Sequence, residues 1–85
     1  MSYNVELSKQ AIKNLKSIPQ NYVRNIYNHL KELEQNPHPK GSIKMAGSEN
    51  TYRLRVGVYR IVYDVFEKEL IIKVITIDHR KDVYK

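Results

Sequence analysis

The 85-residue sequence contains no cysteine, so it can form neither a disulfide nor a thiolate metal site, which fits a reducing compartment. It has no apolar run approaching the roughly 20 residues that a membrane-spanning helix needs. Its N-terminus is mixed in polarity from the start and lacks the apolar run of a signal peptide. We therefore expect a single domain over residues 1–85, soluble and cytoplasmic, with no membrane partner.

Several catalytic signatures are missing as well. The chain has no glycine-rich phosphate loop, no His-Glu-x-x-His motif, no supported Ser/His/Asp arrangement and no clustered carboxylates for magnesium. Neither a metal nor an organic cofactor is expected. A nuclease built from this chain would use the 2′-hydroxyl of RNA as its nucleophile. That reaction needs a base, an acid for the leaving oxygen and cations around the phosphate.

Basic side chains are what the sequence has in excess. Fifteen Lys and Arg against nine Asp and Glu give a formal charge of +6, which favours a polyanion or an acidic protein as partner. In the stretch 51–65, alternation puts Arg53 and Arg55 on one face of a strand, and a reversal at Gly57 brings Arg60 back beside them. Because three guanidinium groups repel one another, the pattern predicts a surface that holds phosphate, with RNA as the expected ligand.

The remaining elements surround this hairpin. Apolar periodicity predicts a strand at 3–7, a helix at 9–17 capped by Ser8, a break at Pro19, a second helix to about residue 35 and a strand at 70–77. The last strand is apolar at nearly every position, which is typical of a central strand covered on both faces. The sequence thus predicts an α+β fold, β-α-α-β-β-β, with an antiparallel sheet and a two-helix hairpin packed on one face.

Residues 36–50 have little periodicity, which indicates a loop. Two of its apolar side chains, Ile43 and Met45, are expected to pin the loop to the core. Lys44 between them is then exposed near the arginine hairpin, and we expect it to contact RNA. A loop of this length in so small a domain is often functional.

The uncovered face of the sheet is the candidate site. Arg53, Arg55 and Arg60 are expected there, and Arg80 follows the last strand closely enough to reach the same surface. Pairing of these arginines with carboxylates of the sheet is the structural alternative. Tyr84, four residues beyond Arg80, can stack on a base or act in catalysis. The tyrosines of the hairpin are expected on the helix-facing side instead: Tyr52, Tyr59 and Tyr63.

Three segments resemble a known family. The stretches YRLRVGVYRIVY at 52–63, DHRKDVY at 78–84 and KMAG at 44–47 are similar to the RelE/ParE superfamily of toxins from bacterial and archaeal type II toxin–antitoxin systems. The resemblance covers essentially the whole chain. RelE-branch toxins cleave messenger RNA in the ribosomal A site and are neutralised by a cognate antitoxin. The resemblance therefore implies an mRNA endonuclease that depends on the ribosome and inhibits translation.

Residue roles follow from the same resemblance. Arg60 would stabilise the charged phosphate in the transition state. Arg80 would act as the acid or as a second phosphate clamp, with Lys81 beside it on the RNA. Tyr84 would stack on the base and orient the 2′-hydroxyl. These roles make the C-terminal segment a part of the predicted site.

The catalytic base is the role that departs from the RelE pattern. Arg53 and Arg55 occupy positions that are lysines in the best-known RelE proteins, one of them implicated as the base. Arginine, with a pKa above ~12, is a poor proton acceptor. The base is therefore expected to be His79 or Tyr84, or else catalysis rests on positioning and electrostatics within the ribosome.

Two other functions stay open at this point. A ParE-like toxin would inhibit DNA gyrase by binding protein, although the C-terminal pair of Arg80 and Tyr84 argues against that branch. A non-catalytic RNA- or protein-binding module would keep the fold without the chemistry, and the missing lysines are compatible with it.

Overall fold

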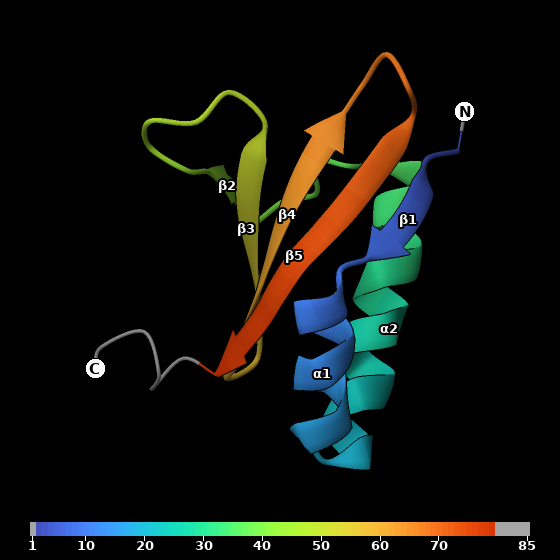
Figure 1. Ribbon diagram of the computed structural model, residues 1–85, viewed down its shortest axis with the longest axis vertical. Helices are drawn as coiled ribbons and strands as arrows, with labels where there is room; N and C mark the ends of the chain where they lie inside the picture. Colours follow the sequence, from blue (N-terminus) through green and yellow to red (C-terminus); the bar gives the residue numbers. More distant parts are fainter. Residues whose placement is uncertain (1, 80–85) are drawn as a thin grey trace.

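The computed structural model describes residues 2–79, in which two helices pack on one side of a five-stranded sheet (Figure 1). In chain order the elements are β1 (Asn4–Leu7), α1 (Lys9–Ser17), α2 (Gln20–Gln35), β2 (Ser42–Lys44), β3 (Thr51–Val56), β4 (Tyr59–Phe66) and β5 (Ile71–His79). The predicted α+β class and the positions of both helices are confirmed. Neither of the helices in this range is long and apolar enough to cross a membrane.

The sheet has the strand order β1-β5-β4-β3-β2 and differs from the expected sheet in two ways. First, β1 pairs with β5 in parallel, whereas all other neighbours are antiparallel. A parallel pair needs a long connection, and the two helices with the other three strands supply it. Second, β2 lies within the predicted loop 36–50. Its three residues are too few to produce a periodic signal in the sequence.

Helix α1 is tied to the edge of β5 by two polar side chains. The predicted Ser8 cap is confirmed, since the Ala11 N–H donates to Ser8 Oγ at 3.0 Å. The Ser8 hydroxyl donates in turn to the Ile75 carbonyl at 2.6 Å, and the Ile77 N–H donates to Asn14 Oδ1 at 3.0 Å. Because β1 pairs only with residues 71–74, α1 satisfies backbone groups that no strand reaches.

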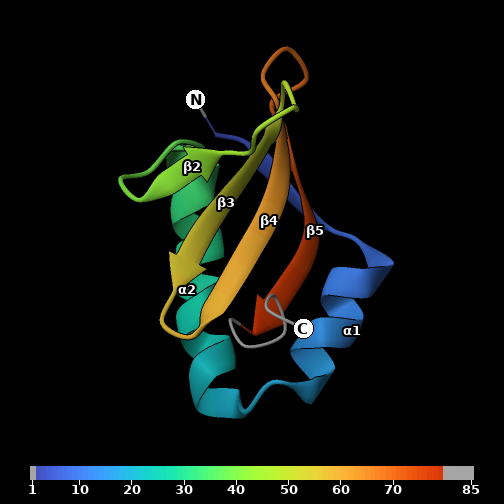
Figure 2. The same ribbon diagram turned by 90° about the vertical axis from the view of Figure 1, so that its left-hand side faces the viewer.

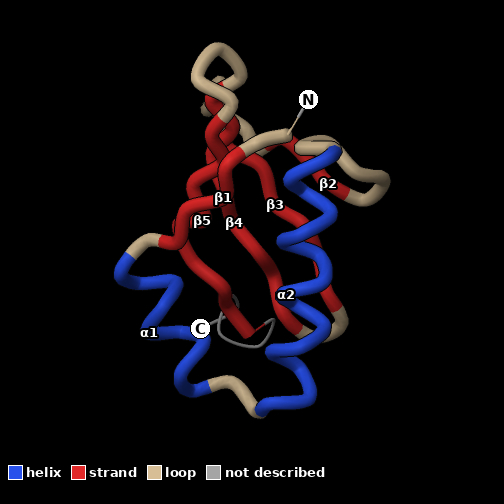
Figure 3. Tube along the Cα trace, turned by 90° about the vertical axis from the view of Figure 1, so that its right-hand side faces the viewer, coloured by secondary structure: helices blue, strands red, loops and turns tan. Residues whose placement is uncertain are grey.

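The core lies between the helices and the sheet face that they cover (Figure 3). Along β4 every second residue is buried, and this set includes Tyr59 and Tyr63, while Tyr52 of β3 is partly buried against the same core. The helix-facing side predicted for these tyrosines is confirmed. In β5, however, Ile72 and Val74 are buried on the helix-facing side, while Lys73 between them points to the other side and is exposed. The prediction of a strand covered on both faces is wrong, because the helices cover one face only.

The segment that leads into β2 is fixed to the sheet. The fully buried Tyr63 donates its hydroxyl to the Pro37 carbonyl at 2.9 Å. The Nε2 atom of His38 lies 2.9 Å from Glu67 Oε1, and the His38 ring lies 4.7 Å from the Tyr52 ring. This segment therefore reaches β2 from a defined position and not as a loose loop.

Within β2 itself, the side chain of Ile43 turns away from the core. Ile43 pairs with Arg53 in the sheet and is 53% exposed. The expected packing of Ile43 on the core is wrong, because its register places it on the uncovered face. Met45, just after the strand, is partly buried.

Replacing Tyr63 by phenylalanine tests the anchor before β2. Burial raises the pKa of the Tyr63 phenol above the ordinary value of 10.0, with Tyr52 adding to the rise and Ser42 opposing it. At neutral pH, Tyr63→Phe should be less stable than wild type by about 1–2 kcal/mol, because the Pro37 carbonyl loses its donor.

The difference in stability between wild type and Tyr63→Phe should change at alkaline pH. Above pH 10.0 the unfolded chain ionises Tyr63 before the folded protein does, so the advantage of wild type should be lost as pH rises through the folded-state pKa. Urea unfolding of both proteins at neutral pH and in alkaline steps measures this difference. A gap that stays constant across the series contradicts the prediction.

Candidate nucleic-acid interface

The β3–β4 hairpin carries three arginines on the sheet face that neither α1 nor α2 covers, which is the face turned to the viewer in Figure 2. The register places Arg55 directly opposite Arg60, and Arg53 opposite Val62. Gly57 permits this register, since it is the first residue of the two-residue turn and its φ of 62° lies in the left-handed region that favours glycine. The three arginines predicted to cooperate are therefore brought together.

Residues paired across the strands form three rows on this uncovered face. The hairpin-end row contains Arg55, Arg60 and Asp78. The middle row contains Ile43, Arg53, Val62 and Thr76. The third row contains Thr51, Asp64, Lys73 and Glu6. Positive charge is thus concentrated in the first two rows, while opposite charges alternate in the third.

None of the three arginines forms an ion pair within residues 2–79. The Asp78 carboxylate accepts from the Thr76 hydroxyl at 2.9 Å. Like charges directly opposite each other in a sheet destabilise it. The Arg55–Arg60 pair is therefore a cost to the fold that a bound anion would relieve, and guanidinium groups suit the oxygens of phosphate.

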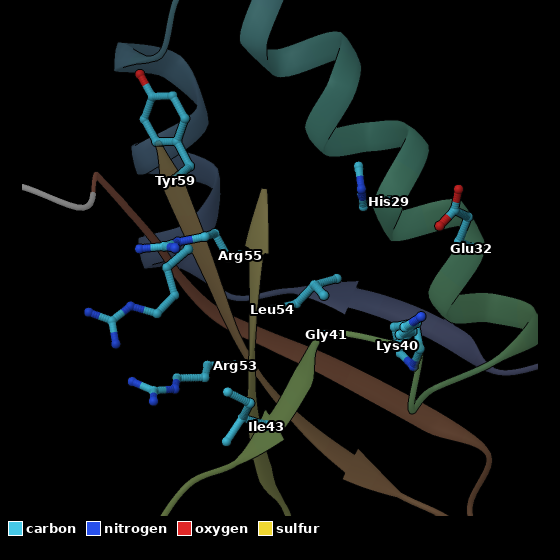
Figure 4. Close-up of a pocket in the computed structure, with 11 residues that line it drawn as sticks. His29, Glu32, Lys40, Gly41, Ile43, Arg53, Leu54, Arg55 and Tyr59 are labelled. Atoms are coloured by element: carbon cyan, nitrogen blue, oxygen red, sulfur yellow. The ribbon is translucent and has the colours of Figure 1, made fainter. Parts of the chain in front are cut away.

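A groove of about 680 Å³ runs beside the arginines, within the range of about 300–1,000 Å³ typical of ligand sites. In Figure 4, Arg53 and Arg55 project to one side of β3, whereas His29 and Glu32 of α2 lie across Leu54 on the other side. The remaining lining residues are Pro39, Lys40, Gly41, Ile43, Tyr59 and Arg60. The groove therefore continues from the arginine face over the edge of the sheet.

The other predicted site residues lie elsewhere. Lys44 is exposed, but it pairs with Tyr52 and so lies on the opposite face of the sheet from the arginines. His79 pairs with Tyr59 on the helix-facing side at the end of β5. The centroids of the two rings lie 5.2 Å apart, and the ring planes form an angle of 82°. Both residues line a second hollow of about 300 Å³ beside α1. The predicted residues outside the described part of the chain are Arg80, Lys81 and Tyr84.

Sequence reasoning did not place Ile43 on the arginine face. It named Asp78 as a possible partner of the arginines, and Asp78 does pair with Arg60 in the register, although it also lines the second hollow with Tyr59 and His79. The position of Asp78 depends on an irregularity opposite Val62 and Tyr63, which shifts the alternation of β5 so that Val74 and then Ile77 are buried. Nothing in the local sequence marks this shift. Among residues 2–79, no group of three or more His, Asp or Glu side chains could hold a metal ion.

Comparison with known proteins identifies the family. The family model for the ParE toxin of the type II toxin–antitoxin system parDE matches residues 5–84. The chain belongs to the RelE/ParE superfamily of toxins. This RelE-like toxin is 33% identical over 88 aligned positions to a RelE1 toxin homologue from Methanocaldococcus jannaschii, covering 100% of this chain and 98% of that one. It is 32% identical to a RelE-like toxin protein from Escherichia coli, covering 99% of this chain and 92% of that one.

The fold agrees with this assignment. The structure superposes with a TM-score of 0.81 on the crystal structure of the archaeal RelE–RelB complex from Pyrococcus horikoshii, at 32% identity. The match covers 94% of this chain and 97% of that one. The RelE/ParE resemblance drawn from the hairpin and C-terminal motifs is confirmed.

Removing one member of the opposed arginine pair should stabilise the toxin. Arg55→Gln should raise the free energy of unfolding by up to about 1 kcal/mol at low salt, because the cross-strand repulsion with Arg60 is lost. The gain should shrink at high salt as screening weakens the repulsion. Arg24→Gln, on the exposed side of α2, changes the net charge equally and serves as the control. Equal stability of both variants would show that the pair carries no repulsive cost.

Proposed function

We propose that this toxin is an mRNA endonuclease that acts on the ribosome and thereby inhibits translation. The observation that carries the proposal is the set of three arginines on the uncovered sheet face, two of them directly opposed and none ion-paired within residues 2–79. Like charges that face each other across a sheet without an ion pair among the described residues are expected where a phosphate binds.

In the proposed reaction, the 2′-hydroxyl of one nucleotide attacks the adjacent phosphorus. A new O–P bond forms as the bond to the 5′-oxygen breaks, which leaves a cyclic phosphate and a 5′-hydroxyl. Negative charge builds up on the phosphate oxygens in the transition state, where preorganised cations stabilise it most. Arg60 occupies the centre of the hairpin-end row, between Arg55 and Asp78, and we assign it this role.

The proton transfers belong to other residues. Arginine is unsuited to act as the base, so His79 or Tyr84 takes the proton of the 2′-hydroxyl, unless the ribosome supplies positioning alone. Arg80 protonates the leaving oxygen or clamps the phosphate, and Tyr84 stacks on the base. These roles rest on the family resemblance. The helix-facing register of His79 favours Tyr84 over His79.

A cognate antitoxin is the proposed partner. The related RelE of Pyrococcus horikoshii forms a complex with RelB. In this protein the net charge of +6 and the arginines that form no ion pair within residues 2–79 favour an acidic or amphipathic segment that covers the hairpin-end row. Such a segment would compete directly with RNA.

One observation favours a second candidate function. The matching family model is that of the ParE toxin, so a protein target such as DNA gyrase has to be tested beside RNA. In that case the arginine face would serve as a docking surface and would cut nothing.

Primer extension on a reporter message after brief expression of the toxin tests the proposal. Discrete cuts within translated codons are expected for wild type and should be lost in Arg60→Ala and in Arg80→Ala. Removing the charge from Arg60 should leave the fold intact, because the side chain lies on the uncovered face. Arg24→Ala is the control for net charge and should cut like wild type. Growth arrest without cuts would favour the protein target, and loss of cooperative thermal unfolding in Arg60→Ala would overturn its assignment to the site.

A further inference from the structure

The most exposed large apolar side chain in residues 2–79, Ile43, lies directly beside the arginine cluster. Ile43 is 53% exposed and pairs with Arg53, so both side chains stand on the uncovered face. On the other side of Arg53 the paired residue is the partly buried Val62. The middle row therefore presents an arginine between two β-branched apolar side chains, next to the row that holds Arg55 and Arg60.

Hydrogen bonds before and after β2 hold Ile43 in its position. Before β2, the chain is anchored by the hydrogen bond from Tyr63 to the Pro37 carbonyl, and after β2 the Met45 N–H donates to the Thr51 carbonyl at 2.8 Å. Ile43 is thus held on a paired strand within the 680 Å³ groove. Sites on strands are positioned more accurately than sites on loops.

Exposed apolar residues are common, so exposure alone has no functional meaning. Ile12 provides the comparison within this chain. It is 43% exposed on α1, outside both hollows. What distinguishes Ile43 is its place within the groove that Arg53, Arg55 and Arg60 also line.

We propose that Ile43 contacts a base of the mRNA, packing against the face of the nucleotide whose phosphate the arginines hold. This inference rests on the proposed function and adds a residue that selects the bound nucleotide. Unpaired bases have apolar faces that proteins hold by stacking and packing, with the phosphates held by basic residues. The middle row provides both kinds of group side by side, since Ile43 offers the apolar surface and Arg53 the charge.

A double-mutant cycle between protein and RNA tests the contact. Ribosomes are programmed with messages whose A-site codon is intact or lacks one base, with the ribose and its 2′-hydroxyl retained. Single-turnover cleavage rates are then measured for wild type, Ile43→Thr and the matched control Ile12→Thr. Threonine keeps the β-branched shape suited to β2, and thermal melts verify that each variant is folded.

For the intact codon, Ile43→Thr should cut about tenfold more slowly than wild type, which corresponds to a lost contact of roughly 50 Å² of apolar surface. Removing the contacted base should slow Ile43→Thr by about tenfold less than it slows wild type, because the contact with Ile43 is already absent in the variant. Ile12→Thr should match wild type on every message. Ile43→Val, which removes a single methyl group, should give a smaller loss of about twofold.

Three outcomes would overturn the proposal. The first is equal cleavage by Ile43→Thr and Ile12→Thr. The second is that, at every codon position, base removal slows cleavage by Ile43→Thr by the same factor as it slows cleavage by wild type. The third is normal cleavage by Ile43→Thr together with weakened antitoxin binding, which would assign the surface to an apolar side chain of the antitoxin. If wild type cuts no intact codon, the proposed function itself fails, and that result is distinguishable from the other three.

Discussion

The register of the β3–β4 hairpin is the constraint on which the site depends. Gly57, with its φ of 62°, allows a two-residue turn, and this turn fixes Arg55 opposite Arg60. A slip of one residue would turn the arginines toward the helices and expose the buried side of the hairpin, Tyr59 included. Hydrophobic burial on one face and charge clustering on the other are therefore set by the same turn. The core holds the register that the site requires.

The distribution of charge over the uncovered face shows where stability and function diverge. In the third row, Asp64, Lys73 and Glu6 alternate in sign across the strands, which is the arrangement a sheet favours. In the hairpin-end row, two arginines stand opposite each other without ion pairs in the described chain. The repulsion is confined to the hairpin end, because the middle row holds Arg53 as its single charged residue and the charges of the third row alternate in sign.

Side-chain hydrogen bonds hold both edges of the sheet in place. Strand β2 has three residues, and its position is secured by the buried Tyr63 hydroxyl on the Pro37 carbonyl and by the contact of His38 with Glu67. At the opposite edge, the side chain of Asn14 in α1 accepts a hydrogen bond from the Ile77 N–H of β5, as the backbone of a neighbouring strand would. Both edges are thereby closed with few residues, and among residues 2–79 no element covers the arginine face.

The sequence alone determined the helices, the long strands, the shared face of Arg53 and Arg55 and the family, because each follows from local periodicity or from contiguous motifs. The tertiary structure alone decided the parallel pairing of β1 with β5, the existence of β2 and the exposure of Ile43 beside Arg53. It also decided that Asp78 joins Arg60 on one face while His79 turns to the other. These features depend on backbone hydrogen bonds between segments far apart in the chain. A local pattern shows which residues share a face of one strand, but the register between strands decides which residues of different strands meet.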